Sequence, residues 1–223
     1  SREKVIEILG METYLSGIAR SAFHRSVVRE NEKYIRARNT YSDSRLEMAA
    51  VIRVEVDTLK IEEAWLDYPG RPPKVVESRE KIESLKGVTA YLGSGLALRK
   101  ALQVVKNDVA RSLFNELVIG IVQAETCLYQ ERGYATTSDY SDAWENFYAG
   151  SCRYYSNTDK IKVSWVDYIG QLSRQINLFG RFKSQQLYRE DSNYIINGTV
   201  LDSFHHVSTS LKLDKDLRVI GAE

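Results

Sequence analysis

Ala50-Val51-Ile52-Arg53-Val54-Glu55-Val56 is the clearest strand pattern in this chain of 223 residues. Ile52, Val54 and Val56 fall on one face of an extended segment, and Arg53 and Glu55 fall on the other. A half-buried strand needs this alternation, because successive side chains point to opposite faces of a sheet. The segment therefore predicts a β-strand with one face in a core.

Alternation on both sides of this segment predicts further strands. Tyr34–Tyr41 and Lys60–Trp65 alternate in the same way, and Asp43-Ser44 and Asp57-Thr58 supply turn signals between the segments. The sequence therefore predicts an antiparallel meander over about residues 23–68.

The residues that follow predict a helical middle over about 78–155. Pro69-Gly70-Arg71-Pro72-Pro73 ends the meander, because adjacent prolines can neither donate to a sheet ladder nor continue a helix. Val109–Arg132 would be about 36 Å long as a helix, and its apolar arc is too wide for a surface helix, so we expect it at the centre of the fold. The other helices are expected in the charged run Ser78–Leu85, in Leu96–Val105, and from a cap at Ser141 towards Tyr148, with Asp142 and Glu145 spaced as in a capping box.

Strand patterns return over about residues 179–220, and the chain resembles itself there. Phe23-His24-Arg25, Tyr34-Ile35 and Asp43-Ser44 are followed in the same order by Phe179-Gly180-Arg181, Tyr194-Ile195 and Asp202-Ser203. We therefore predict an α+β fold in which two antiparallel β-meanders, from a duplicated unit or from independent segments, flank a helical middle with one long central helix. One core favours a single domain over residues 1–223.

Composition excludes several classes of protein. Apolar residues make up 43% and charged residues 27% of the chain, as in globular proteins, and the net charge of +1 gives no global field for nucleic acid. The longest apolar run, Leu117–Val122, is far shorter than the roughly 20 residues of a membrane span, and the polar start does not read as a signal peptide. We expect a cytoplasmic protein with neither a nucleic-acid nor a membrane partner.

Glu125 is the strongest catalytic candidate, because it projects into the apolar arc of the long helix. A desolvated carboxyl group has a raised pKa and could act as a general acid or base. The structural alternative is that Glu125 pairs with an arginine or a tyrosine hydroxyl and orders the core.

Other residues are candidates for ligand binding. Glu116, Gln123 and Cys127 follow one line of the long helix, with Gly120 as a gap, and would line a pocket or form a solvated face. Cys152 stands beside Arg153 and is either an activated thiol or an inert one. Gly93-Ser94-Gly95, before a helix with Arg99, would bind a phosphate or form an ordinary turn.

No metal site and no cofactor are expected. The two cysteines cannot alone complete a zinc site, and the three histidines offer no pair four residues apart. Tyrosines clustered at Tyr140, Tyr148, Tyr154 and Tyr155 indicate either a contact surface or part of a large core.

The order of these features resembles an uncharacterised bacterial family, domain of unknown function 2889. The resemblance rests on His24, Leu85-Lys86-Gly87, Leu113-x-x-Glu116-Leu117, the segment around Cys152, and Phe204-His205-His206-Val207. Members of that family place Gly-Cys-Thr-His-Leu at the start of the long helix, where this chain reads Val109-Ala110-Arg111-Ser112-Leu113. The resemblance implies the fold and a bacterial origin, and the missing thiol and imidazole argue against a metal or redox role.

These observations favour a non-enzymatic accessory or binding protein, with a pocket or dimer surface between the sheet and the long helix. Its partners would be a small-molecule ligand and a second copy or another protein. One alternative is a small cofactor-independent enzyme acting on an acyl thioester or an aromatic acid, with Glu125 as base. The other is a structural subunit of a larger assembly.

Overall fold

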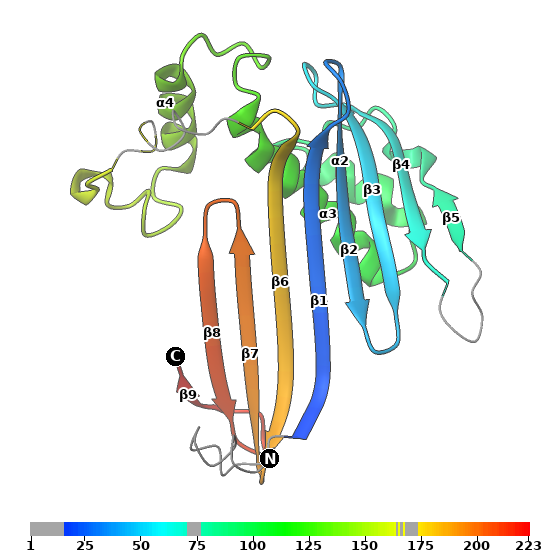
Figure 1. Cartoon of the computed structure of the whole chain (residues 1–223), viewed down its shortest axis with the longest axis vertical. Helices are drawn as coiled ribbons and strands as arrows, with labels where there is room; N and C mark the ends of the chain where they lie inside the picture. Colours follow the sequence, from blue (N-terminus) through cyan, green and yellow to red (C-terminus); the bar gives the residue numbers. More distant parts are fainter. Residues whose placement is uncertain (1–15, 71–76, 164, 166, 168–173) are drawn as a thin grey trace, which may run out of the picture. The chain divides into compact units, whose positions relative to one another are not determined.

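A computed structural model describes residues 16–70, 77–163, 165, 167 and 174–223. Its strands form one antiparallel sheet in the order β5-β4-β3-β2-β1-β6-β7-β8-β9 (Figure 1). Both meanders are present, and the α+β class is confirmed. The strands are β1 (Ser16–Arg29), β2 (Tyr34–Asp43), β3 (Glu47–Glu55), β4 (Ile61–Tyr68), β5 (Ser78–Lys81), β6 (Asn177–Glu190), β7 (Asn193–Asp202), β8 (His206–Leu213) and β9 (Val219–Ala222), and the α-helices are α2 (Gly95–Ala101), α3 (Asp108–Ala124) and α4 (Thr137–Tyr148).

The chain divides into two compact units, which are described separately. The helical unit consists of Ser26–Asn39 and Ala49–Phe179, and the strand unit consists of Ser1–Arg25, Thr40–Met48 and Gly180–Glu223. The single domain expected from the sequence remains a prediction. No helix in the described part of the chain combines the length and the hydrophobicity needed to cross a membrane.

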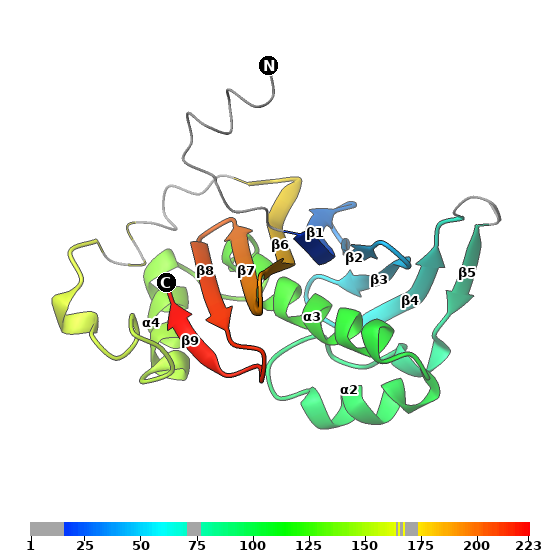
Figure 2. The same cartoon turned by 90° about the horizontal axis from the view of Figure 1, so that it is seen from below.

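The core of the helical unit lies between its strands and α3. Helices α2 and α3 lie on one face of β2–β5 (Figure 2). Ile35 and Ala37 of β2 and Leu113 and Leu117 of α3 are completely buried, and each buried leucine contributes about 1.5–3 kcal/mol. The Asn39 amide donates a hydrogen bond to the Leu113 carbonyl at 3.3 Å, which satisfies a polar group inside this layer.

Strand β3 is buried on both faces, so buried and exposed residues do not alternate along it as the sequence predicted. Ile52 and Val54 are buried as predicted, but Ala49 and Val51, on the other face, are at most 1% exposed as well. Their cross-strand partners on β4 are Asp67 and Trp65. On the face away from α3, Ala49 and Val51 thus lie beside the larger side chains of Asp67 and Trp65.

Three helix predictions need correction. Ser78–Lys81 is an edge strand paired with Trp65–Tyr68, because pairing with β4 outweighs the helical preference of this charged run. The long helix runs from Asp108 to Ala124 and then tightens into a 3-10 turn, so it ends before Arg132. Helix α4 begins at Thr137, since Thr136 and Asp139 form the capping box in place of Asp142 and Glu145.

The strand unit is built from a long hairpin and its neighbours. Strands β6 and β7 pair from Arg181–Asp202 to Glu190–Asn193, and β7 continues the register to β8. Asp202 ends β7 by accepting hydrogen bonds from two backbone N–H groups, and Asp43 ends β2 in the same way. The two aspartates are equivalent in the predicted repeat, and the duplication itself remains a prediction.

Candidate functional site

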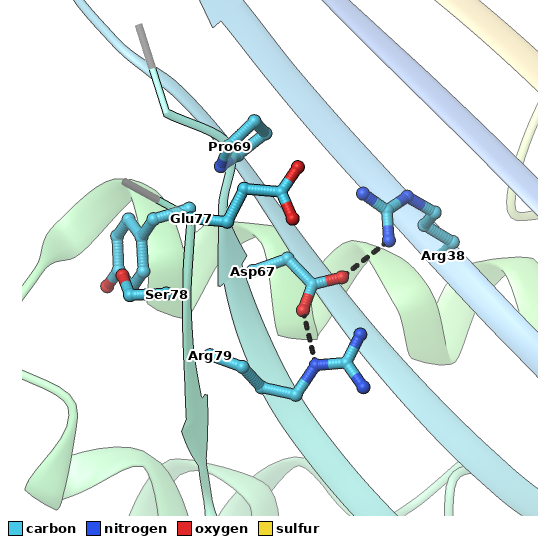
Figure 3. Close-up of a pocket in the computed structure, with 7 residues that line it drawn as sticks. Arg38, Asp67, Pro69, Glu77, Ser78 and Arg79 are labelled. Carbon is cyan, nitrogen blue, oxygen red and sulfur yellow. Dashed lines mark hydrogen bonds and ion pairs between the residues drawn. The ribbon is translucent and has the colours of Figure 1, made fainter. Parts of the chain in front are cut away.

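A pocket of about 370 Å³ lies where β4 ends and β5 begins, in the helical unit (Figure 3). It opens on the face of the sheet away from α3. Arg38 comes from β2, whose neighbouring residues Ala37 and Asn39 point into the core. The lining residues are Arg38, Asp67, Tyr68, Pro69, Glu77, Ser78 and Arg79.

Asp67 organises the charges of this pocket. Its Oδ2 accepts a hydrogen bond from Arg38 Nη1 and its Oδ1 accepts one from Arg79 Nε, both at 2.7 Å. The Asp67 side chain is 15% exposed, whereas those of Arg38 and Arg79 are 41% and 64% exposed. One nearly buried carboxylate therefore holds two accessible guanidinium groups in fixed directions.

The electrostatics agree with this geometry. Partial burial alone would raise the pKa of Asp67, but the hydrogen bonds from Arg79 and Arg38 hold this pKa below its ordinary value. The Arg79 guanidinium also lies over the Trp65 ring, 5.0 Å from its centre. Asp67 is therefore ionised at neutral pH, and Arg79 is held on two sides.

Glu77 supplies a second negative charge on another wall of the pocket. Its carboxylate points into the space beside Pro69 and towards Arg38 (Figure 3). Glu77 forms no hydrogen bond or ion pair with any residue that the structure describes. The pocket thus contains guanidinium N–H groups of Arg38 and Arg79 that Asp67 does not use, and the carboxylate of Glu77, which pairs with none of the described residues.

The arrangement suits binding better than covalent chemistry. Its described lining offers the hydroxyls of Ser78 and Tyr68 but neither an imidazole nor a thiol. No cluster of three or more His, Cys, Asp or Glu residues in the described part of the chain could hold a metal ion. The groups present can bind charged parts of a molecule through hydrogen bonds.

Sequence reasoning missed this pocket. Arg38 belongs to a segment recognised only as a strand, and Ser78 and Arg79 belong to a segment predicted to be a helix. Asp67 stands at the end of β4, with Arg79 on the neighbouring strand β5 and Arg38 two strands away on β2, so the three residues form no local motif. The one available signal was the placement of Arg36 and Arg38 on the polar face of an alternating strand.

Glu125 is buried as predicted, at 1% exposure, and both of its carboxylate oxygens are engaged. Tyr91 Oη donates to Oε2 at 2.5 Å, and Arg132 Nε donates to Oε1 at 3.0 Å. Arg132 also donates to the carbonyl of Asp57 and lies 5.6 Å from the centre of the Tyr91 ring. This is the arrangement expected of the structural alternative, and the catalytic role remains a prediction.

The aromatic residues around Glu125 form a packed cluster. Tyr140 and Trp144 of α4 pack on Val122, with Tyr91, Tyr129, Tyr134, Tyr148 and Tyr155 around them. Burial raises the pKa of Tyr91, and the hydrogen bond to Glu125 raises it further. Tyr140 is 1% exposed, so the tyrosine-rich segment contributes in part to a core.

The line predicted along α3 is half-buried and does not reach the pocket. Glu116, Gln123 and Cys127 are partly exposed, while Gly120 is buried. The Cys127 thiol lies 3.7 Å from the carbonyl of Leu178, and burial raises its pKa.

The remaining candidates lie apart from one another. Cys152 is exposed, and both cysteines are free thiols. Ser94 donates its hydroxyl to the carbonyl of Tyr91 at 2.6 Å, and Gly93 has a positive φ, so this segment forms a turn. Arg99 Nε donates to the carbonyl of Gly95, within the seven-residue helix α2. None of these residues lines the pocket at Asp67.

Comparisons with protein-family models, with curated proteins and with solved structures gave no match. The resemblance to the family of domain of unknown function 2889 therefore remains a prediction.

Proposed function

We propose that this protein is a non-enzymatic binding protein that holds a small zwitterionic molecule, such as an α-amino acid, in the pocket at Asp67. The observation that carries the proposal is the pair of accessible guanidinium groups fixed by one carboxylate, beside a second carboxylate, that of Glu77, which pairs with none of the described residues. The site therefore differs in position from the surface between sheet and helix that the sequence suggested.

The balance of charge favours a zwitterion over a simple anion. Among the described lining residues, Arg38 and Arg79 carry two positive charges, and Asp67 and Glu77 carry two negative charges. A simple anion would gain the guanidinium contacts but would also meet the Glu77 carboxylate. A molecule with a carboxylate and an ammonium group complements both walls, and each charge-assisted hydrogen bond contributes about 1.5–3 kcal/mol.

The catalytic alternative has less support from the geometry. Glu125, its proposed base, is held by Tyr91 and Arg132. Loss of turnover on a defined substrate in Glu125→Gln, with the fold intact, would favour the enzyme.

Isothermal titration of a panel of amino acids against the purified protein tests the proposal. We expect at least one member to bind, and its des-amino analogue to bind more weakly; leucine and 4-methylpentanoate are one such matched pair. Arg79→Gln should weaken binding of both compounds. Glu77→Gln should weaken only the amino acid, because the ammonium contact is lost while the carboxylate contact stays.

Arg36→Gln is the matched control. Arg36 lies on the same strand as Arg38 but pairs with Glu30, outside the pocket. This variant should bind as the wild type does. Binding of the des-amino acid as tight as that of the amino acid, or no binding by any member of the panel, would contradict the proposal.

A further inference from the structure

A groove of about 750 Å³ lies along β1 in the strand unit and shares no residue with the pocket at Asp67. Strand β1 lies between β2 and β6 in the sheet (Figure 1). The groove is lined by five residues of β1 between Gly17 and Ala22, by Ser42–Ser44 where β2 ends, and by Phe182, Gln186 and Tyr188 of β6. All of these residues belong to the strand unit, and the volume is in the range of ligand pockets.

The side of the groove formed by β6 is aromatic. Phe182 and Tyr188 point to the same face of β6, because they lie an even number of positions apart on one strand. Phe182 is 40% exposed, and Ile18 of β1 is 51% exposed, so both present apolar surface to solvent. Gly17 and Ala22 add little side-chain volume on β1. The groove therefore has room for a flat apolar group against the aromatic rings.

Arg20 brings a positive charge to this apolar surface. It shares a face of β1 with Ile18 and Ala22, because the three residues are spaced by two. Arg20 is exposed, and it forms no hydrogen bond or ion pair with any residue that the structure describes. Its guanidinium group is therefore available to a carboxylate, which it can bind through two parallel N–H groups.

Asp43, the carboxylate in the described lining of the groove, is engaged by its own turn. Its Oδ2 accepts a hydrogen bond from the Tyr41 hydroxyl at 2.6 Å, and its Oδ1 accepts bonds from the backbone N–H groups of Arg45 and Leu46, both at 2.7 Å. These hydrogen bonds hold the pKa of Asp43 below its ordinary value. Both oxygens are thus used within the turn, whereas the guanidinium group of Arg20 is open.

Gln186 adds neutral donors beside the rings. The Tyr188 hydroxyl donates to Gln186 Oε1, so the amide N–H groups of Gln186 remain for a ligand. Beyond the groove, the same face of the sheet continues through Tyr188 to Lys212 of β8, which pairs with Glu190 at 2.6 Å. Because that pair does not line the groove, Arg20 is the cation that a ligand meets there.

We infer that this groove binds a small aromatic carboxylate, with its carboxylate on Arg20 and its ring against Phe182 and Tyr188. An aliphatic acid would pair with Arg20 but would lose the ring contacts. A neutral aromatic molecule would keep those contacts but would leave the guanidinium group without a partner. A zwitterion would find no open carboxylate for its ammonium group, because Asp43 is engaged by the turn.

Isothermal titration of 2-naphthoate and of its neutral analogue 2-naphthamide against the full chain tests the inference. We expect 2-naphthoate to bind and 2-naphthamide to bind about tenfold more weakly, because the amide cannot form the charge-assisted contact. Arg20→Gln should weaken 2-naphthoate by about the same factor, and Arg20→Lys, which keeps the charge, should weaken it less. Phe182→Ser should weaken both compounds about fivefold. Both sites are exposed, so circular dichroism spectra should match the wild type.

Arg189→Gln is the matched control. Arg189 is also exposed on β6, but it points to the opposite face from Tyr188 and donates to the carbonyl of Asp191. This variant should bind 2-naphthoate as the wild type does.

Three results would overturn the inference. The first is a wild type that does not bind 2-naphthoate, and the second is an Arg20→Gln variant that binds it as tightly as the wild type. The third is binding that Arg79→Gln abolishes and Arg20→Gln does not, since the ligand would then occupy the pocket at Asp67. A failed amino-acid panel would contradict the function proposed for that pocket and would leave this inference standing, because the two sites share no residue.

Discussion

Replacing Glu125 by glutamine tests the role of the most deeply buried carboxylate that sequence reasoning singled out. Glutamine keeps the shape of the side chain but removes its charge and turns one acceptor into a donor. Tyr91 and Arg132 both donate to Glu125, so one of the two must lose its acceptor. We expect the variant to fold with lower stability.

The magnitude follows from the two contacts. A hydrogen bond to a charged group contributes about 1.5–3 kcal/mol, and breaking a buried ion pair costs about 3–5 kcal/mol. Arg132 keeps its hydrogen bond to the Asp57 carbonyl, and its side chain is 18% exposed, so the loss of stability is smaller than for a fully buried pair. We therefore expect the free energy of unfolding to fall by about 2–4 kcal/mol.

Urea denaturation followed by tryptophan fluorescence measures this change. With a urea dependence of about 3 kcal/mol per molar, the midpoint should fall by about 1 M. Glu131→Gln is the control, because Glu131 also pairs with an arginine, Arg29, but is 42% exposed. An exposed pair contributes less than about 1 kcal/mol. If Glu125→Gln changes the free energy of unfolding by no more than Glu131→Gln does, the structural role assigned to Glu125 is wrong.

Three further outcomes are expected. Leu117→Ala removes a fully buried side chain of α3 and should lower the free energy of unfolding by about 2–5 kcal/mol in the same urea assay, unless the core closes over the cavity. Burial alone would raise the pKa of Asp202, but hydrogen bonds from backbone N–H groups and from Arg181 hold this pKa below its ordinary value of 3.8. The Asp202 carboxylate therefore stabilises the fold above pH 3.8. This stabilisation is lost as the pH falls through the lowered pKa that Asp202 has in the folded state. Asp202→Asn should therefore flatten the pH dependence of unfolding below about pH 4, and an unchanged acid profile would contradict this assignment. Iodoacetamide at pH 8 should label exposed Cys152 at least about ten times faster than Cys127, whose pKa is raised by burial, and mass spectrometry of peptides would show equal labelling if Cys127 were the activated thiol.

The strand pattern determined the fold class without help from tertiary structure. Ile52 and Val54 alternate with Arg53 because successive side chains of an extended segment point to opposite faces, and this signal is local. The same holds for the turn aspartates Asp43 and Asp202, which end strands through their own side chains. The burial of Glu125, the first residue after α3, was also predictable, since helical spacing continued by one residue places it in the apolar arc.

Only the tertiary structure determined where the charged segments lie. Ser78–Lys81 has residues suited to a helix, yet it pairs with β4, because Asp67 and Trp65 on that strand bind Arg79. The pocket at Asp67 depends on side chains from three strands separated by up to 41 positions in the chain, from Arg38 to Arg79. A local pattern fixes which face of its own segment a residue occupies, but the partner across the sheet is set by pairing between distant segments.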